Sequence, residues 1–398
     1  MSSFLAHPWL SALLGAAALS AVYLLLARRA LRRVLLSDQD RELIRVPLAT
    51  PGHHVALVHH PASVRRFKTP VLLCHGLAVG RFNLDLHDDG HGSDRTSLAR
   101  ALSRAGFDVW LLELRGRGHA TVPRGASWSI DDEVREDVPA AIAAVLERTR
   151  APDLIWVGHS KGSLLQYLFH ARGHPLAGRV RALVAIGSPG TLRHQPWLRR
   201  LVRPGRVILS LTRRIPLGAL AWTIIPLSGL IHRLGRRYDP ALEDNDGPAL
   251  ARILASLPAS ISAGVARQML SWIERSDGAF TTLDGARDED HYDRLTMPLL
   301  LVAGARDYLV PPEAVAFVRD RAGAQDLTFR VAGRAEGFSR DYGHGDLLVG
   351  RHAPQEVFPL IERWLEAHAE PVDTLALSPA PPAPPAPPTL EAAVLASK

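Results

Sequence analysis

The residue of this sequence best suited to chemistry is a serine between closely spaced glycines. Ser160 is the centre of a G-x-S-x-G pentapeptide, residues 158–162. The apolar run Leu154–Val157 before it predicts a short buried strand, and Leu164–Ala171 after it predicts a helix. A serine at such a strand-to-helix corner is held in a strained conformation that exposes its hydroxyl. The pattern predicts a nucleophile, with the backbone N–H of Lys161 directed at a developing oxyanion.

Short apolar runs alternate with helical patterns along most of the remaining chain. Further strands are predicted at Leu43–Val46, Val55–Val58, Val71–Cys74, Val109–Leu114, Ala182–Ile186, Leu299–Val302 and Leu327–Val331. Helices are predicted at Ser97–Ala105, Ala140–Leu146 and Val357–Ala367. Strands that alternate with helices predict an α/β fold with a mostly parallel sheet, whose site residues follow the carboxyl ends of the strands.

The pentapeptide and the segments around it resemble the α/β-hydrolase superfamily, and within it the acid lipases, the group of gastric and lysosomal lipases. The superfamily resemblance is carried by residues 158–162, His75-Gly76, Gly304–Asp307 and Gly343–Gly345. The similarity to acid lipases is carried by His75–Leu77, Ser97-Leu98, Ala105–Trp110, Arg115-Gly116, Trp128–Asp132, Asp137–Ala140, His344, Asp346, Gly350, Ala353 and Pro354. The resemblance covers about residues 70–190 and 295–365, and it fades between 191 and 290. It implies an α/β-hydrolase fold and a serine hydrolase.

A serine hydroxyl needs a base to take its proton and a third group to hold that base. In this superfamily the chain order is serine, acid, histidine. Asp307, which follows a predicted strand, is the candidate acid, and His344, which lies between two glycines, is the candidate base. A simple turn or helix-cap role is the alternative for Asp307. His291 and His352 are rivals for the base, but neither follows the last predicted strand with a glycine on each side.

The loop after the predicted strand Val71–Cys74 should supply the second oxyanion donor. Gly76 allows close backbone approach, so the amides of Leu77 and Lys161 are the predicted pair. His75 and His159 are expected to brace these loops rather than to act as bases.

Neither a metal ion nor an organic cofactor is expected. Three histidines and three aspartates gather in one part of the sequence, but their spacing matches no ligand pattern, which favours a solvated polar loop: His87, His91, His119, Asp85, Asp88 and Asp89. The single cysteine, Cys74, excludes an internal disulfide and ends an apolar run, as a buried thiol would.

The N-terminus has the pattern of a membrane anchor, assigned to residues 1–36. Residues 1–27 contain no Asp, Glu, Lys or Arg, and Pro8–Ala27 is apolar over about the length that crosses a bilayer. Four arginines follow this run: Arg28, Arg29, Arg32 and Arg33. A cleaved signal peptide carries its positive charge before the apolar run. The order found here therefore favours a single-pass anchor with the domain on the cytoplasmic face. An apolar helix packed on the domain is the alternative.

Residues 191–290 are too long for an ordinary loop and are expected to form a helical cap over the catalytic pocket. The chain carries 47 basic and 40 acidic residues, a net charge of +7. Ten arginines of the cap have no acid among them: Arg193, Arg199, Arg200, Arg203, Arg206, Arg213, Arg214, Arg233, Arg236 and Arg237. Because long apolar runs separate them and no nucleic-acid motif is present, an anionic membrane surface is favoured over nucleic acid. A solvated face over a buried apolar side is the alternative.

The chain thus divides into an anchor (1–36), the first part of the core (37–190), the cap (191–290), the second part of the core (291–369) and a Pro/Ala-rich tail (370–398) expected to be extended and disordered. The predicted function is hydrolysis of a carboxylic ester with an apolar acyl chain. An acyltransferase with the same three residues and a non-catalytic membrane scaffold are the alternatives. Epoxide hydrolase and dehalogenase chemistry are disfavoured, because those relatives carry an aspartate at the nucleophile position.

Overall fold

The computed structural model describes residues 8–34, 42–86, 96–235, 245, 247–256 and 259–372. Its centre is an eight-stranded sheet with the order β1-β2-β4-β3-β5-β6-β9-β10. The strands are β1 (Leu43–Pro47), β2 (His54–His60), β3 (Val71–Cys74), β4 (Val109–Glu113), β5 (Leu154–His159), β6 (Val180–Ile186), β9 (Leu299–Gly304) and β10 (Leu327–Ala332). From β4 to β10 all neighbours are parallel, whereas β1 and β2 pair antiparallel with each other and β2 pairs antiparallel with β4.

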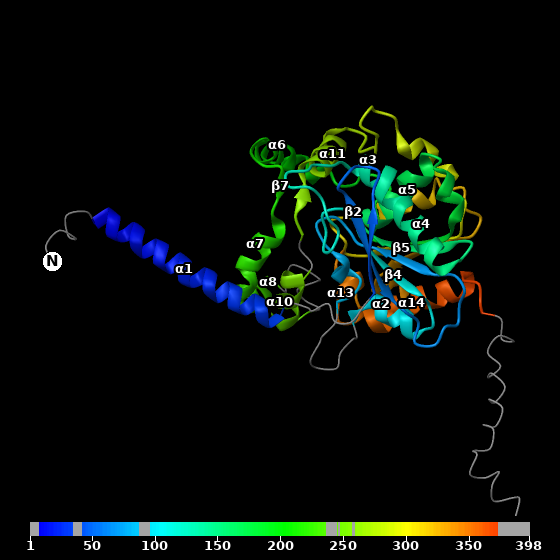
Figure 1. Ribbon diagram of the computed structural model, residues 1–398, viewed down its shortest axis with the longest axis horizontal. Coiled ribbons are helices and arrows are strands. Elements are labelled where there is room, and N and C mark those ends of the chain that lie inside the picture. The colour runs from blue at the N-terminus through cyan, green and yellow to red at the C-terminus, as the bar shows by residue number, and fades with distance from the viewer. Residues whose placement is uncertain are drawn as a thin grey trace, which may run out of the picture.

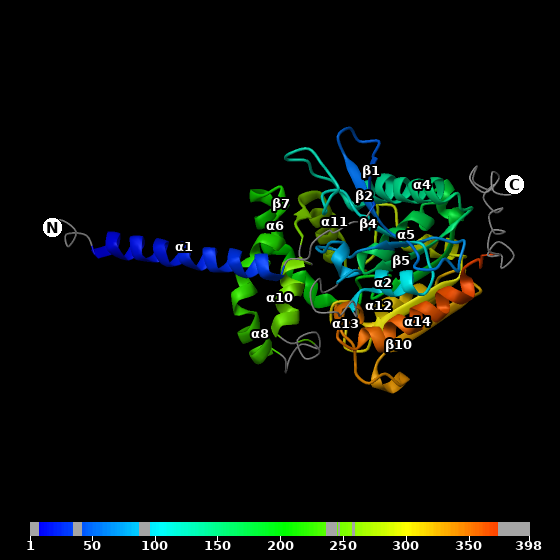
Figure 2. The same ribbon diagram turned by 60° about the horizontal axis from the view of Figure 1, so that its bottom comes forward.

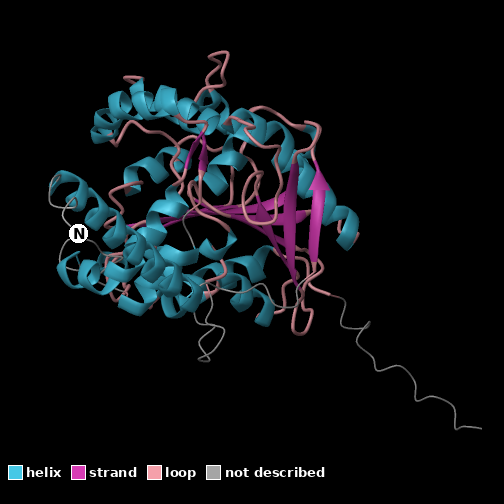
Figure 3. Ribbon diagram, turned by 60° about the vertical axis from the view of Figure 1, so that its left-hand side comes forward, coloured by secondary structure: helices cyan, strands magenta, loops and turns pink. Residues whose placement is uncertain are grey.

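Helices cover both faces of this sheet, as Figure 3 shows. Around the sheet lie α2 (Leu98–Arg104), α3 (Ile130–Asp132), α4 (Val138–Thr149), α5 (Lys161–Ala171), α12 (Pro312–Arg319), α13 (Asp346–Val349) and α14 (Ala353–His368). Apolar side chains of α4, α5 and α12 pack in one hydrophobic cluster, and those of α2, α13 and α14 pack in the other. Strands β3, β5, β6 and β9 are buried from both sides, which explains their uninterrupted apolar runs.

A helical insertion separates β6 from β9 and lies beside one end of the sheet (Figure 1). It contains η6 (Pro196–Leu201), α6 (Val202–Leu211), β7 (Arg214–Ile215), α7 (Leu217–Ile224), η7 (Ile225–Leu227), α8 (Ser228–Gly235), α10 (Gly247–Ser256), β8 (Ile261–Ser262), α11 (Ala263–Glu274) and η8 (Asp288–Arg294). Strands β7 and β8 form a separate two-stranded antiparallel ladder. The insertion therefore has its own secondary structure and is not a long loop.

The N-terminal helix α1 (Pro8–Val34) projects from the rest of the molecule (Figures 1 and 2). Its C-terminal part packs on the insertion, where Leu31 and Val34 contact an apolar cluster that includes Ile225 and Ala251. Farther along α1, Leu19 and Leu25 are exposed. Within the described residues, one helical stretch meets the length and hydropathy expected of a membrane span, Leu217–Gly235 in the insertion, with a mean hydropathy of 1.3.

The predicted α/β fold with a mostly parallel sheet is confirmed, and every predicted strand is present. The main local feature that the sequence patterns missed is a π-helical turn, Glu133–Asp137, which joins α3 to α4. Predictions for His87, Asp88, Asp89, His91, Arg236, Arg237 and most of the Pro/Ala-rich tail fall outside the described residues.

Candidate active site

The turn between β5 and α5 holds Ser160 in a conformation that few residues adopt. Its φ is +53° and its ψ is −120°, a type of backbone state that costs about 1–3 kcal/mol unless the surroundings enforce it. A Cβ on Gly162 would lie 2.3 Å from the carbonyl oxygen of Cys74, and one on Gly158 would lie 2.4 Å from the amide nitrogen of Ser163. The two glycines therefore allow the close packing of β3, β5 and α5 that fixes the serine.

Asp307 and His344 form a hydrogen-bonded pair in the loops after β9 and β10. Nδ1 of His344 lies 2.7 Å from Oδ2 of Asp307, whose side chain is fully buried. The other carboxylate oxygen, Oδ1, accepts hydrogen bonds from the backbone amides of Leu309 at 2.9 Å and Val310 at 2.7 Å. Asp307 thus shapes a turn and holds the imidazole at the same time. Because Nδ1 of His344 is engaged, Nε2 is the nitrogen available for proton transfer.

Contacts along β5 and β6 bring His344 close to Ser160. The amide of Ser160 donates to the carbonyl oxygen of Ile186 at 2.8 Å. The next residue, Gly187, lies against the imidazole, since a Cβ there would be 3.3 Å from Nδ1 of His344. Nε2 of His159 lies 3.1 Å from the carbonyl oxygen of His344, and the two ring centroids are 4.7 Å apart. Ser160 and His344 line the same cavity, with the Asp307 carboxylate behind the imidazole.

The loop after β3 runs directly against the serine. A Cβ on Gly76 would lie 3.2 Å from the Cβ of Ser160. The next residue, Leu77, and the first residue of α5, Lys161, both line the cavity that contains Ser160. Ala78 has a φ of +60°, which is uncommon for a residue other than glycine. The two positions predicted to supply oxyanion amides therefore border the cavity beside the serine.

Two histidines next to the site are buried and have strongly lowered pKa values. Nδ1 of His75 lies 2.9 Å from the carbonyl oxygen of Gly76, and its Nε2 accepts a hydrogen bond from the amide of Leu114 at 3.4 Å. Burial, with a smaller contribution from nearby cationic side chains, lowers the pKa of His75 to about 3. Burial, with a smaller contribution from the neighbouring imidazole, lowers the pKa of His159 to about 3. Both rings stay neutral near pH 7 and brace the loops.

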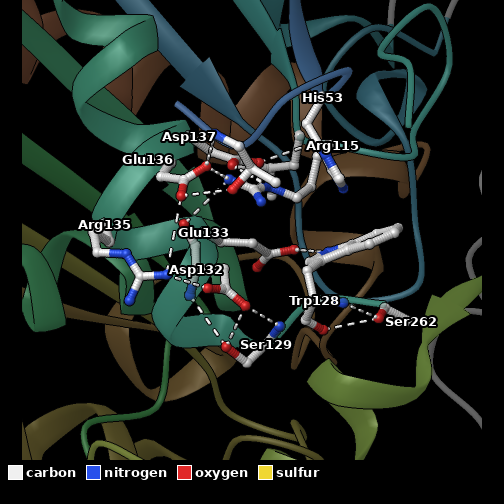
Figure 4. A network of polar contacts seen from close by, with 12 residues as sticks. His53, Arg115, Trp128, Ser129, Asp132, Glu133, Arg135, Glu136, Asp137 and Ser262 are labelled. Atoms are coloured by element: carbon white, nitrogen blue, oxygen red, sulfur yellow. Dashed lines mark hydrogen bonds and ion pairs between the residues drawn. The ribbon is translucent and has the colours of Figure 1, made fainter. Parts of the chain in front are cut away.

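The side chain of Lys161 ends in a buried ion pair with Glu133, and the two side chains are 3% and 2% exposed. Glu133 also accepts a hydrogen bond from Nε1 of Trp128 at 3.3 Å (Figure 4). The backbone amide of Trp128 donates to Oγ of Ser262 at 2.9 Å, and this hydroxyl donates to the carbonyl oxygen of Trp128 at 2.8 Å. The residue after the serine is thus linked through Glu133 and Trp128 to the start of α11.

A second buried ion pair lies in the same network (Figure 4). Nε of Arg115 lies 2.6 Å from Oδ1 of Asp137, and its Nη2 lies 2.8 Å from Glu136. The backbone amide of Arg115 donates to Asp137 at 2.9 Å. These contacts satisfy the charges that the π-helical turn buries, as buried ions require.

An apolar cavity of about 510 Å³ adjoins Ser160. Much of its wall comes from the insertion, including Leu198, Leu209, Ile215, Ile261, Met269 and Leu270. The amide of Ala259 donates to the carbonyl oxygen of Ala78 at 2.8 Å, which joins the insertion to the loop after β3. The volume and apolar lining are typical of a site for a small apolar ligand.

The rival histidines lie elsewhere in the described chain. His291 is exposed in η8, and His352 precedes α14. Among the described residues, no group of three or more His, Cys, Asp or Glu side chains is arranged to hold a metal ion.

Several residues that shape the site escaped the sequence analysis. Gly187 could have been found, because it directly follows the predicted strand Ala182–Ile186. Glu133 carries no local signal, since the lysine that it pairs with, Lys161, lies 28 positions further along the chain. The strain at Ala78 likewise depends on contacts that the sequence does not reveal.

Comparison with curated proteins shows that the chain is similar to several lipases. The chain is 25% identical to lipase member K of Mus musculus over 328 residues, which cover 75% of this chain and 80% of that protein. It is 32% identical to lysosomal acid lipase/cholesteryl ester hydrolase of Homo sapiens over 128 residues, which cover 30% of this chain and 31% of that protein.

Among solved structures, the fold is similar to that of a thermophilic esterase from Thermogutta terrifontis, with a TM-score of 0.52 and 21% sequence identity. That match covers 82% of this chain and 99% of the esterase. The family model described as the alpha/beta hydrolase fold matches residues 69–335, more than half of the chain. This protein is a member of the α/β-hydrolase family.

Proposed function

We propose that this protein is a membrane-anchored serine hydrolase that cleaves carboxylic esters with an apolar acyl chain. The observation that carries this proposal is the position of the His344–Asp307 pair, joined at 2.7 Å, beside a strained serine in an apolar cavity. The family membership and the lipase relatives also support ester hydrolysis.

In the proposed reaction, Oγ of Ser160 attacks the ester carbonyl while Nε2 of His344 takes its proton. Asp307 holds the imidazole through Nδ1 and stabilises the imidazolium that forms. The amides of Leu77 and Lys161 donate to the oxyanion, and a single donor of this kind contributes about 10²–10³-fold in rate. His344 then returns the proton to the leaving alcohol, and water releases the acid from the acyl-enzyme. These steps need no metal and no organic cofactor.

We further propose that α1 anchors the protein in a membrane and that residues 191–290 act as a cap facing the same bilayer. The apolar run of α1 is followed by arginines, and by the positive-inside rule this order favours a catalytic domain on the cytoplasmic face. Because α1 packs on the insertion, the anchor would hold the cap close to the lipid.

The surface of the insertion is suited to an anionic leaflet. Exposed apolar side chains lie on its helices: Val207, Ile208, Leu211, Leu220, Leu227, Leu230 and Leu234. Exposed arginines, including Arg203, Arg206 and Arg233, lie among them. Apolar groups that enter the interface and cations that meet anionic headgroups are the two requirements of an interfacial helix.

Replacement of the nucleophile tests the chemistry. Ser160→Ala should lower the turnover of nitrophenyl butyrate by at least about 10⁴-fold, because the hydroxyl that attacks the carbonyl is removed. The double variant Ser160→Ala/His344→Ala should be no slower than the single variant, since the two residues act as a unit. The exposed serine in Ser63→Ala is the matched control and should leave turnover unchanged. Equal turnover in Ser160→Ala and the unaltered protein would contradict the proposal.

Analysis of the products formed in the presence of an added alcohol distinguishes hydrolysis from acyl transfer to that alcohol.

The low pKa values of the buried His75 and His159 predict that the protein loses stability in acid. Their folded pKa values of about 3 lie below the usual value of 6.5, so the unfolded chain binds more protons at pH values between these two. The stabilisation is complete above pH 6.5 and falls as the pH decreases. From pH 6.5 to pH 5 the free energy of unfolding should drop by about 2 kcal/mol per histidine. Urea unfolding of the detergent-solubilised protein measures this drop. His159→Gln should remove about half of it, and His194→Gln, at an exposed position, should not. A free energy that stays constant down to pH 5 would exclude this account.

Charge reversal on α6 tests the membrane-facing cap. In liposomes, turnover of an apolar ester should be higher with anionic than with zwitterionic lipid. Arg203→Glu/Arg206→Glu should abolish this difference, because each basic residue near the surface contributes about 1 kcal/mol. Arg179→Glu/Arg363→Glu reverses two exposed arginines outside the insertion and should retain the difference. If the α6 variant keeps the full stimulation, the cap does not face the anionic leaflet.

A further inference from the structure

Helices α6 and α11 form part of the cavity wall and are fixed to each other at one end. The β7–β8 ladder pairs Ile215 with Ile261, and both of these side chains line the cavity. Just before β8, Ala259 is hydrogen-bonded to Ala78 in the loop beside Ser160. The ladder end of the two helices is therefore the end tied to the reaction centre.

Away from the ladder, the two helices approach each other at a glycine. Gly205 lies inside α6, six residues before the helix ends at Leu211 and so about 9 Å along its axis. A Cβ on Gly205 would lie 2.9 Å from Cδ1 and 3.3 Å from Cδ2 of Leu270 on α11. A glycine inside a helix is unfavourable relative to alanine, so helix stability does not explain the residue. The glycine is explained instead by Leu270, whose side chain occupies the space that a side chain at position 205 would need.

Leu270 is also part of a thin wall. Together with Leu209, it lines both the cavity of about 510 Å³ and an outer groove of about 340 Å³. Arg206 and Arg267 border this outer groove, so it is far more polar than the cavity. Gly205 and Leu270 thus meet where the apolar cavity gives way to a basic surface.

We propose that Gly205 and Leu270 set the length of acyl chain that the cavity accepts. This inference rests on the proposed ester hydrolysis and adds its chain-length class: the acyl chain runs from Ser160 past Ile215 and Ile261 toward the Gly205–Leu270 contact. A side chain at position 205 pushes Leu270 into the path of long chains and leaves short chains untouched. Shortening Leu270 removes the obstruction.

The test compares nitrophenyl acetate with nitrophenyl palmitate, using the full chain in lipid nanodiscs. Gly205→Val should lower kcat/KM for the palmitate by about tenfold or more relative to the acetate, since lost or blocked methylene contacts in an apolar pocket have effects of this size. Adding Leu270→Ala to this variant should restore the ratio. The matched control is Gly229→Val on α8, where no heavy atom lies within 4 Å of the added Cβ, and it should leave the ratio unchanged.

Thermal unfolding of each variant separates a blocked cavity from a damaged fold. Gly205→Val should remain folded at the assay temperature, because the better helix propensity of valine partly offsets the displacement of the flexible Leu270 side chain. An unchanged palmitate-to-acetate ratio in folded Gly205→Val overturns the proposal. A lowered ratio that Leu270→Ala does not restore overturns it as well.

A crosslinking experiment that needs no catalysis tests the chain path independently of the proposed ester hydrolysis. A long-chain fatty acid with a terminal diazirine is photo-crosslinked to Ser160→Ala and the labelled peptides are mapped by mass spectrometry. Label in α6 and α11, lost in Ser160→Ala/Gly205→Val, supports the chain path even if the unaltered protein hydrolyses no ester. Absence of label from both helices contradicts the chain path, even if hydrolysis depends on Ser160.

Discussion

The site depends on one steric constraint, the absence of space for side chains around the turn between β5 and α5. A Cβ on Gly162 would clash with the carbonyl oxygen of Cys74, and a Cβ on Gly158 would clash with the amide of Ser163. Backbone packed this closely keeps Ser160 at a positive φ that an isolated chain would avoid. The strain is maintained by β3 and β6 on either side of β5; β3 is fully buried, and so is β6 apart from Arg181. The core of the sheet thus provides the rigidity that a strained serine at the edge of a cavity needs.

Two buried ion pairs behind this turn also constrain the packing of the chain. Lys161 and Glu133 are removed from water almost completely, as are Arg115 and Asp137. Buried pairs of this kind contribute little net stability, but the loss of one partner is costly. Their geometry therefore restricts how the chain can pack around α3, α4 and α5. Through Trp128 and Ser262, the same contacts join Lys161, the residue after Ser160, to the insertion that lines the cavity.

Features that depend on local pattern could be predicted from the sequence, and features that depend on tertiary contacts could not. The central strands were predictable because buried parallel strands are continuous apolar runs, as in Leu154–Val157. The candidates Asp307 and His344 were predictable because each follows a strand at the same edge of the sheet. By contrast, the bond from His159 to the carbonyl of His344 joins residues 185 positions apart. The contact between Gly205 and Leu270 likewise depends on how two helices of the insertion pack, and no periodicity in either helix indicates it.

The central claim is that the Ser160 hydroxyl is activated as a nucleophile, and covalent trapping tests it most directly. The full chain is incubated at pH 7.5 with an alkyl fluorophosphonate, which reacts with serines that a neighbouring base has activated. Mass spectrometry of the intact chain and its peptides then locates the adduct. The account predicts one adduct per chain, on the peptide that contains Ser160, and much slower labelling when His344 is replaced by alanine. No adduct, or an adduct on another residue with Ser160 unmodified, would contradict it.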